Sequence, residues 1–184
     1  MKVPKLLFPG FFLAIIVLVG YGFYNKKEEK KAIFSVNYHV DKELYVLNSP
    51  WFFNKPRISV SLFQLKDKDI RFFQNPSADF FSNYPQLPSP SYKKWNIVKW
   101  KQTPYNKVDS EYVKIALDVS EGAFFLEEDV MPDVTEALNF VRNVIAEQGN
   151  YYAILYKLHA DNKYSVDLFV VAPKRKLLVE INRR

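Results

Sequence analysis

Two histidines, His39 and His159, are the residues of this sequence best suited to acid–base chemistry or metal binding. Either role needs a second ligand or a carboxylate held close by. Neither histidine has such a residue at a recognisable spacing, and each lies on the more polar side of an alternating segment. The pattern therefore predicts two surface histidines and no metal or catalytic centre.

The acidic run 127–129 (EED), followed by Asp133, offers oxygen ligands of the kind that Ca²⁺ prefers. It lacks the regular alternation and the central glycine of a calcium-binding loop, so an acidic lead-in to a helix is the better interpretation. Asp118 and Glu121 form a second carboxylate pair, of a type that is common on protein surfaces. We assign no catalytic role to either group.

Signatures of the common nucleotide enzymes and serine hydrolases are absent from the sequence. After residue 31 the chain has two glycines, Gly122 and Gly149, which rules out a glycine-rich phosphate loop and a G-x-S-x-G elbow. The chain has no cysteine, and therefore no disulfide, thiolate metal site or cysteine nucleophile. The sequence thus predicts a protein that is not an enzyme and needs no cofactor.

The segment 92–101 (YKKWNIVKWK) interleaves cationic and aromatic side chains. Such a mixture suits contact with a protein partner or an anionic membrane surface, or stacking on single-stranded nucleic acid. A simpler interpretation is an amphipathic strand with tryptophan inward and lysine in water, and we favour it. The candidate interaction surface consists of Lys93, Lys94, Trp95, Lys99, Trp100 and Lys101.

An uncharged segment, residues 6–24, precedes these residues and predicts a transmembrane anchor. Its nineteen residues form a helix of about 28 Å, close to the thickness of a bilayer's hydrocarbon core. A short basic tail (1–5) comes before it and a charged spacer (25–31) after it. A cleaved signal peptide is the alternative, but the apolar run is longer than such peptides need. The lipid bilayer is therefore an expected partner.

The net charge of +6 belongs mainly to the flanks of this segment. Residues 1–31 contain six lysines and two glutamates, giving +4, which leaves +2 for residues 32–184. Lysines beside an apolar span suit lipid headgroups, so we expect no nucleic-acid partner. The lysine count near each end favours a cytoplasmic domain, whereas the very short tail favours export. We expect an inner-membrane protein with an exported, periplasmic or extracellular domain.

Residues 32–184 have the length of a single domain, and their patterns predict an α+β fold with a mainly antiparallel sheet. One amphipathic helix is expected from a capping box at Asp133 and Glu136 to a stop at Gly149. A proline-rich loop is expected at 75–91, with a helical turn capped by Ser77. Strands are expected at 34–40, 44–47, 58–62, 70–73, 92–101, 113–119, 151–159, 164–171 and 177–181.

The expected order at the carboxyl end, a helix followed by a three-stranded meander, resembles the layout of cystatin-like and NTF2-like folds, in which a curved sheet wraps one helix. Element order transfers no function. The anchor and the absence of catalytic signatures favour an accessory or assembly subunit of a bacterial envelope complex that binds another protein. An envelope immunity protein that neutralises a toxin, and a small-ligand carrier or hydrolase with a pocket between helix and sheet, are the alternatives.

Overall fold

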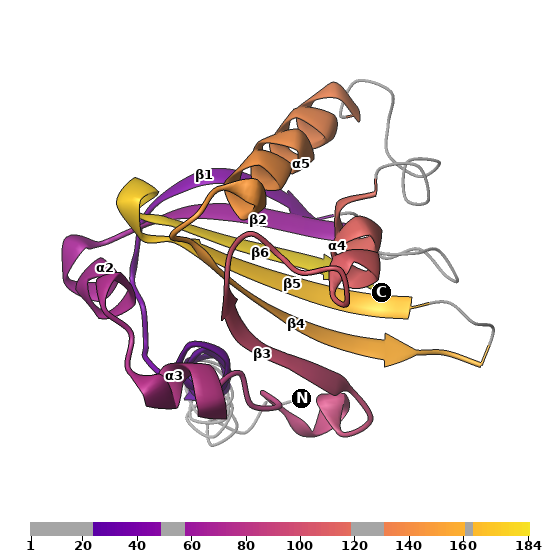
Figure 1. Cartoon of the computed structure of the whole chain (residues 1–184), viewed down its shortest axis with the longest axis horizontal. Coiled ribbons are helices and arrows are strands. Elements are labelled where there is room, and N and C mark those ends of the chain that lie inside the picture. The colour runs from indigo at the N-terminus through magenta and orange to yellow at the C-terminus, as the bar shows by residue number, and fades with distance from the viewer. Residues whose placement is uncertain (1–23, 49–57, 119–130, 161–163) are drawn as a thin grey trace, which may run out of the picture.

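The computed structural model describes residues 24–48, 58–118, 131–160 and 164–184 (Figure 1). It is an α+β fold with a six-stranded antiparallel sheet in the order β1-β2-β6-β5-β4-β3. The expected α+β class with a mainly antiparallel sheet is therefore confirmed. The strands are β1 (Val40–Asn48), β2 (Ile58–Leu65), β3 (Asn96–Gln102), β4 (Tyr151–Leu158), β5 (Tyr164–Ala172) and β6 (Leu177–Arg183).

The first described element is a helix over residues 24–34, here called the N-terminal helix. Among the described residues, no helix combines the length and the apolar character that a bilayer crossing requires. The predicted anchor at 6–24 lies outside these residues except for Tyr24. The other helical elements are α2 (Asp67–Gln74), α3 (Ala78–Asn83), η1 (Pro90–Tyr92), α4 (Ser110–Leu117), α5 (Met131–Ala146) and η3 (Pro173–Arg175).

Hydrophobic cores lie on both faces of the sheet, which differs from the expected single helix on one face. On one face, α4 and α5 lie over the sheet (Figure 1) and pack against alternate residues of the strands, with Leu138 of α5 fully buried. On the other, a second core joins the strands to the N-terminal helix, α2 and α3. Both faces need cover because β4 and β5 are apolar at nearly every position.

The carboxyl-terminal half largely follows the sequence patterns. Helix α5 and the meander β4-β5-β6 are confirmed, and Gly149 has the positive φ of 87° expected after a helix. The helix begins at Met131, so Asp133 lies in its first turn and does not cap it. In the proline-rich loop, Ser77 caps α3 through its side chain, as expected, and Phe80 is fully buried.

The predicted hairpin of strands 34–40 and 44–47 is wrong. Phe34 ends the N-terminal helix, and the expected turn at 41–42 lies inside β1, which pairs with β2. The helix stops at Ser35, which has a left-handed φ of 66° and donates its backbone N–H to the Lys31 carbonyl at 2.9 Å. Alternation over a few residues misled the prediction because Phe34 and Tyr38 are also four residues apart.

Two further predicted strands, at 70–73 and 113–119, are helices α2 and α4. The buried residues of α2 are Ile70 and Phe73, and those of α4 are Val113, Ala116 and Leu117. These spacings of three and four residues fit a helix. In segments of eight residues, the same apolar side chains also satisfy an alternating pattern in part, so periodicity alone did not separate the two structures.

The N-terminal helix is fixed to the sheet by its last turn. The Phe34 ring is 1% exposed and packs against four other aromatic rings. The Trp100 indole N–H donates to the Ile33 carbonyl at 2.8 Å, and the Gln86 N–H donates to the Ala32 carbonyl at 2.7 Å. Because the helix's final carbonyls bond to the body of the domain, the helix is an integral part of the fold.

Phe34→Ala is expected to lower the free energy of unfolding by about 3–5 kcal/mol, because it removes a buried ring and leaves a cavity. Denaturant titration followed by tryptophan fluorescence measures the change. Tyr24→Ala, at the 61%-exposed start of the same helix, is the matched control, with an expected change within about 0.5 kcal/mol. Similar values for the two variants would contradict the packing of this helix on the sheet.

Candidate functional site

Two buried or partly buried carboxylates lie on one face of the sheet, on neighbouring strands. In β5, alternation places Asp167 on the same face as Phe169, and in β6 it places Glu180 with Asn182. The register pairs Asp167 with Asn182 and Phe169 with Glu180. This is the face that the N-terminal helix covers, so other segments of the protein shield both carboxylates from solvent.

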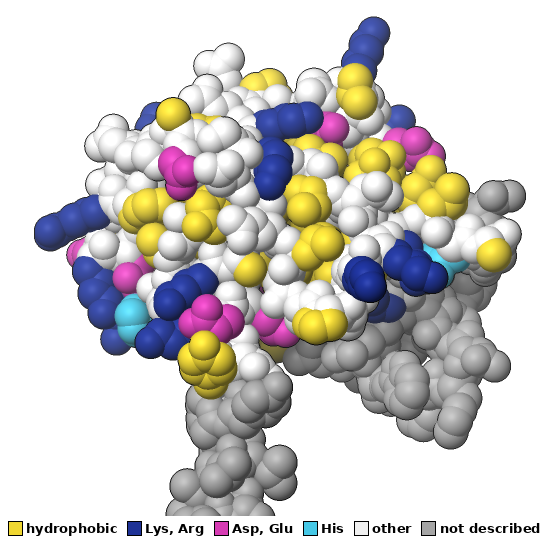
Figure 2. All heavy atoms as spheres, turned by 90° about the horizontal axis from the view of Figure 1, so that it is seen from below, with side chains coloured by type: hydrophobic (Ala, Val, Ile, Leu, Met, Phe, Trp, Pro, Cys, Tyr) yellow, Lys and Arg dark blue, Asp and Glu magenta, His cyan; other side chains and the backbone are white. Residues whose placement is uncertain are grey.

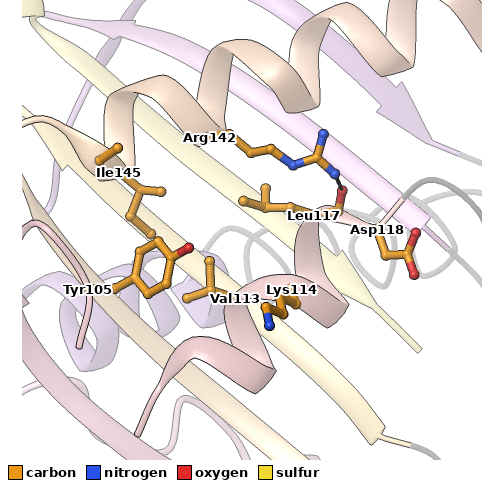
Figure 3. Close-up of a pocket in the computed structure, with 8 residues that line it drawn as sticks. Tyr105, Val113, Lys114, Leu117, Asp118, Arg142 and Ile145 are labelled. Carbon is orange, nitrogen blue, oxygen red and sulfur yellow. Dashed lines mark hydrogen bonds between the residues drawn. The ribbon is translucent and has the colours of Figure 1, made fainter. Parts of the chain in front are cut away.

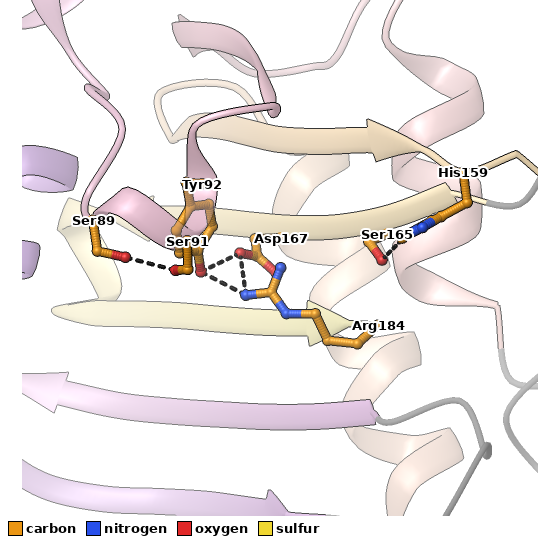
Figure 4. A network of polar contacts seen from close by, with 7 residues as sticks. All are labelled: Ser89, Ser91, Tyr92, His159, Ser165, Asp167 and Arg184. Atoms are coloured by element: carbon orange, nitrogen blue, oxygen red, sulfur yellow. Dashed lines mark hydrogen bonds and ion pairs between the residues drawn. The ribbon is translucent and has the colours of Figure 1, made fainter.

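Asp167 is fully buried and joins three parts of the chain (Figure 4). Its Oδ2 accepts from the Tyr92 hydroxyl at 2.8 Å and from the Arg184 guanidinium at 3.0 Å. Its Oδ1 has no hydrogen-bond partner among the described residues. Burial raises the pKa of Asp167 to about 6, although Arg184 and the Tyr92 bond act in the opposite direction.

Arg184 connects this carboxylate to an aromatic pair. Its guanidinium lies 4.3 Å from the Trp95 ring centroid and 5.1 Å from that of Tyr92. It also donates to the Tyr92 hydroxyl at 2.5 Å. Stacking on aromatic faces while donating to a carboxylate suits the planar guanidinium group. These contacts of Arg184 connect η1 and the following Trp95 to the strands β5 and β6.

Glu180 has its own aromatic partner. The Tyr38 hydroxyl donates to Glu180 Oε1, and the Lys30 ammonium lies 4.1 Å from the centroid of the Tyr38 ring. Burial raises the pKa of the Glu180 carboxyl, while the Tyr38 bond and Lys30 lower it. The pKa of Tyr38 is raised by burial and by the neighbouring carboxylate. Lysine, tyrosine and glutamate thus form a second polar cluster beneath the N-terminal helix.

A cavity of about 450 Å³ lies at this second cluster. The N-terminal helix contributes Lys26, Glu29 and Lys30 to its wall, and β6 contributes Glu180 and Asn182. Aromatic side chains line the rest, among them Tyr38, Phe63, Tyr92 and Phe169. Charged and polar side chains contribute at least as much of its wall as apolar ones, so it is a concave site of mixed polarity.

A smaller cavity of about 390 Å³ lies between α4 and α5 (Figure 3). Arg142 from α5 reaches across it and donates to the Leu117 carbonyl at 2.5 Å. This bond satisfies an open carbonyl at the end of α4, which is a structural role. Val113, Leu117 and Ile145 supply apolar walls, and Lys114, Asp118 and Arg142 are the charged residues of the lining.

The structure separates the six residues of the predicted interaction surface. Lys93 and Lys94 are exposed and Trp95 is partly buried, whereas Trp100 is 2% exposed and stacks on Phe80 with centroids 5.1 Å apart. The first tryptophan precedes β3, and the second lies within β3 where the β3–β4 register shifts, between Val98 and Lys101. An interaction role for residues 93–95 remains a prediction.

The two other lysines of that set bond within the fold. The Lys99 ammonium donates to the Asn83 and Pro85 carbonyls, each at 2.9 Å. The Lys101 ammonium pairs with Asp109 at 2.7 Å, and Asp109 is 2% exposed. Both lysines therefore hold β3 to neighbouring segments, which accounts for their positions without a ligand.

The predicted surface histidines have ordinary local partners. His39 is exposed and its Nδ1 lies 3.1 Å from Asp69 Oδ2, and the ring of the partly exposed His159 lies 2.7 Å from the Ser165 hydroxyl. Within the described ranges, no group of three acidic or histidine side chains could hold a metal ion. The acidic run 127–129 and Glu121 lie outside those ranges.

Charges on the face seen from below are mixed (Figure 2). Lysine and arginine side chains stand among acidic and apolar ones across the described part of this face. Backbone binding of nucleic acids favours a continuous basic stripe. The mixture on this face gives no support for a nucleic-acid partner, whose exclusion remains a prediction.

Comparison of the chain with protein-family models, with curated proteins and with solved structures finds no match. The site must therefore be interpreted from its own geometry.

Sequence reasoning missed the two buried carboxylates, although a signal for them exists. In β2, β5 and β6 the polar residues fall at alternate positions, so that three adjacent strands carry them on one face, namely Ser59, Ser61, Ser165, Asp167, Glu180 and Asn182. Alternation by itself is typical of a face in contact with water. The covering by the N-terminal helix and η1 depends on contacts between distant segments.

The free energy of unfolding is expected to fall as the pH rises from about 4 to 7, because Asp167 holds its proton more tightly in the folded chain. Its carboxyl titrates near 6 when folded, against 3.8 in its ordinary state. The stabilising effect of the proton is complete below pH 4 and lost above about pH 7, and amounts to about 3 kcal/mol.

Asp167→Asn isolates this effect, because the amide does not titrate. The unfolding free energy of Asp167→Asn minus that of the wild type should rise through this pH range, as measured by urea titration at each pH. Asp41→Asn, at an exposed carboxyl, is the control and should follow the wild-type profile. Parallel profiles for Asp167→Asn and the wild type would refute the raised pKa of Asp167.

Proposed function

We propose that this chain is a single-pass, membrane-anchored domain that binds another protein and is not an enzyme. In this proposal residues 6–24 span the inner membrane and the folded domain lies on its outer side. The domain acts as an accessory or assembly subunit of a bacterial envelope complex. One observation of the described fold supports a binding module: other residues cover one edge of the sheet, whereas no described residue pairs with the other edge.

The edge at β3 is covered by the segment that follows α3. The Trp100 backbone N–H donates to the Tyr84 carbonyl at 3.1 Å, and the Lys99 ammonium donates to the carbonyls of Asn83, at the end of α3, and Pro85. At the other edge, β1 pairs with β2 on one side, and no described residue pairs with its outer side. An open strand edge is a template for a strand of another chain.

The two halves of β1 differ in character. Residues 41–43 (DKE) are charged and exposed, and register shifts flank this half, both of which disfavour pairing with another strand. In the following half, Leu44 and Val46 are 48% and 42% exposed. Tyr45 and Leu47 point the other way and pack against the core under α5. An extended partner segment would therefore pair with residues 44–48 and cover Leu44 and Val46.

The N-terminal helix supports placement of this domain close to a bilayer. Its described part begins at Tyr24, the last residue of the predicted anchor, and its last turn is packed into the core by Phe34. The two best-placed acids serve internal contacts, Asp167 with Arg184 and Glu180 with Tyr38, which supports a role without catalysis. The order from α5 to β6 supports a cystatin-like or NTF2-like layout for this part of the chain.

The uncleaved anchor predicts that the full chain remains in the membrane pellet after extraction at alkaline pH. A variant lacking residues 6–24 should appear in the soluble fraction. Mass spectrometry of the mature full chain should find the original amino terminus, and protease added to spheroplasts should degrade the domain. A mature chain that begins near Phe23 and leaves the membrane freely would contradict the anchor, and a domain protected from protease would contradict export.

The edge proposal predicts the ligands that a library of displayed decapeptides yields when the domain is the target. Selected peptides should carry apolar residues at alternate positions, and their binding should slow amide hydrogen exchange in β1. Leu44→Asp with Val46→Asp should weaken that binding at least tenfold, because both side chains lose their apolar contacts.

The control is Val108→Asp, at an 80%-exposed valine outside β1, which should leave the affinity unchanged. Equal loss in both variants, or ligands that leave the β1 amides unprotected, would refute the edge as the binding surface.

A further inference from the structure

The cavity under the N-terminal helix has more acidic than basic side chains in its lining. The acids are Glu29, Glu43 and Glu180, and the bases are Lys26 and Lys30. Lys26 and Glu43 are exposed, whereas Lys30 and Glu180 lie further in. The inner wall is therefore built around a carboxylate, and the exposed residues form a mixed rim.

The inner end of the cavity already holds an alkyl ammonium group, that of Lys30. This group lies 4.1 Å from the centroid of the Tyr38 ring, whose hydroxyl donates to Glu180. An aromatic face beside a carboxylate is the environment that proteins use to bind organic cations. Burial lowers the pKa of Lys30, and Glu180 opposes this effect. The contacts of Lys30 thus show how this cavity can hold a primary ammonium group.

A second carboxylate adds to the negative character of this region. Asp167 lies behind Tyr92, whose ring lines the cavity, and its Oδ1 has no partner among the described residues. The charge of Glu180 also raises the pKa of Asp167, so the two carboxylates act on each other across the sheet. A cation brought into the cavity would relieve this repulsion.

We propose that this cavity binds a small ligand with a primary ammonium group on a short alkyl chain. The ammonium is held by the Glu180 carboxylate and the Tyr38 ring in the place of Lys30, and the alkyl chain lies between Phe63 and Phe169. An anion would meet three carboxylates in this cavity and is disfavoured. Val40 and Glu43 of β1 line this cavity, but the half of β1 proposed to pair with a partner, residues 44–48, does not. The ligand proposal does not depend on the proposed protein partner.

The test uses the full chain in detergent micelles and three probes of equal length, pentylamine, pentanol and pentanoate, with binding followed by ligand-observed NMR. Pentylamine should bind saturably, pentanol at least tenfold more weakly, and pentanoate more weakly still. Glu180→Gln should weaken amine binding about tenfold. Glu147→Gln, at an exposed carboxylate paired with Arg175, is the matched control and should leave the affinity unchanged.

Two further variants keep the test decisive if Glu180→Gln fails to fold. Glu43→Gln changes an exposed rim carboxylate and should weaken amine binding about twofold. Lys30→Met removes the competing ammonium and should strengthen amine binding several-fold. Equal affinity for the three probes, no saturable amine binding, or weaker binding in Lys30→Met would overturn the proposal.

A primary ammonium group is present both in free amines and in the headgroup of phosphatidylethanolamine. Vesicles of phosphatidylethanolamine and of phosphatidylcholine distinguish the two sources, because the choline nitrogen carries no N–H. Binding that is specific for ethanolamine vesicles and is competed by pentylamine identifies a lipid ligand, and binding of the free amine alone identifies a soluble one. If neither the free amine nor the ethanolamine vesicles bind, the proposal is wrong.

Discussion

The need to cover both faces of the sheet governs the rest of this structure. The strands β4 and β5 are apolar at most positions, so a single layer of helices leaves many of their apolar side chains in water. The second layer is assembled around Phe34, which packs edge-on or tilted against rings from three other parts of the chain. Because that ring ends the N-terminal helix, the packing also fixes how the chain enters the domain.

Sequence periodicity predicted the elements whose pattern is long. Helix α5 covers sixteen residues and shows its apolar stripe over four turns, and the meander that follows it has clear turn residues. The segments that failed, 34–40, 70–73 and 113–119, are short enough for alternation and helical spacing to share the same apolar residues. Contacts with the sheet decided their structure, since Phe34, Phe73 and Val113 are each buried against strands distant in sequence.

The candidate site, too, could be predicted from the sequence only in part. Alternation in β5 and β6 is sufficient to place Asp167 and Glu180 on one face, but their partners are distant in sequence. Tyr92 precedes Asp167 by 75 residues and Tyr38 precedes Glu180 by 142. The lysine and tryptophan residues of 92–101 were recognisable as a group, whereas their division between core and surface depends on an irregularity in strand pairing and on carbonyls of the preceding loop.

The hydrogen bond from the Trp100 indole to the Ile33 carbonyl ties the N-terminal helix directly to the sheet. It joins the last turn of that helix to an edge strand of the sheet, and the Gln86 bond holds the same turn from another side. The direction of the N-terminal helix relative to the sheet is therefore set by hydrogen bonds as well as by the packing of Phe34.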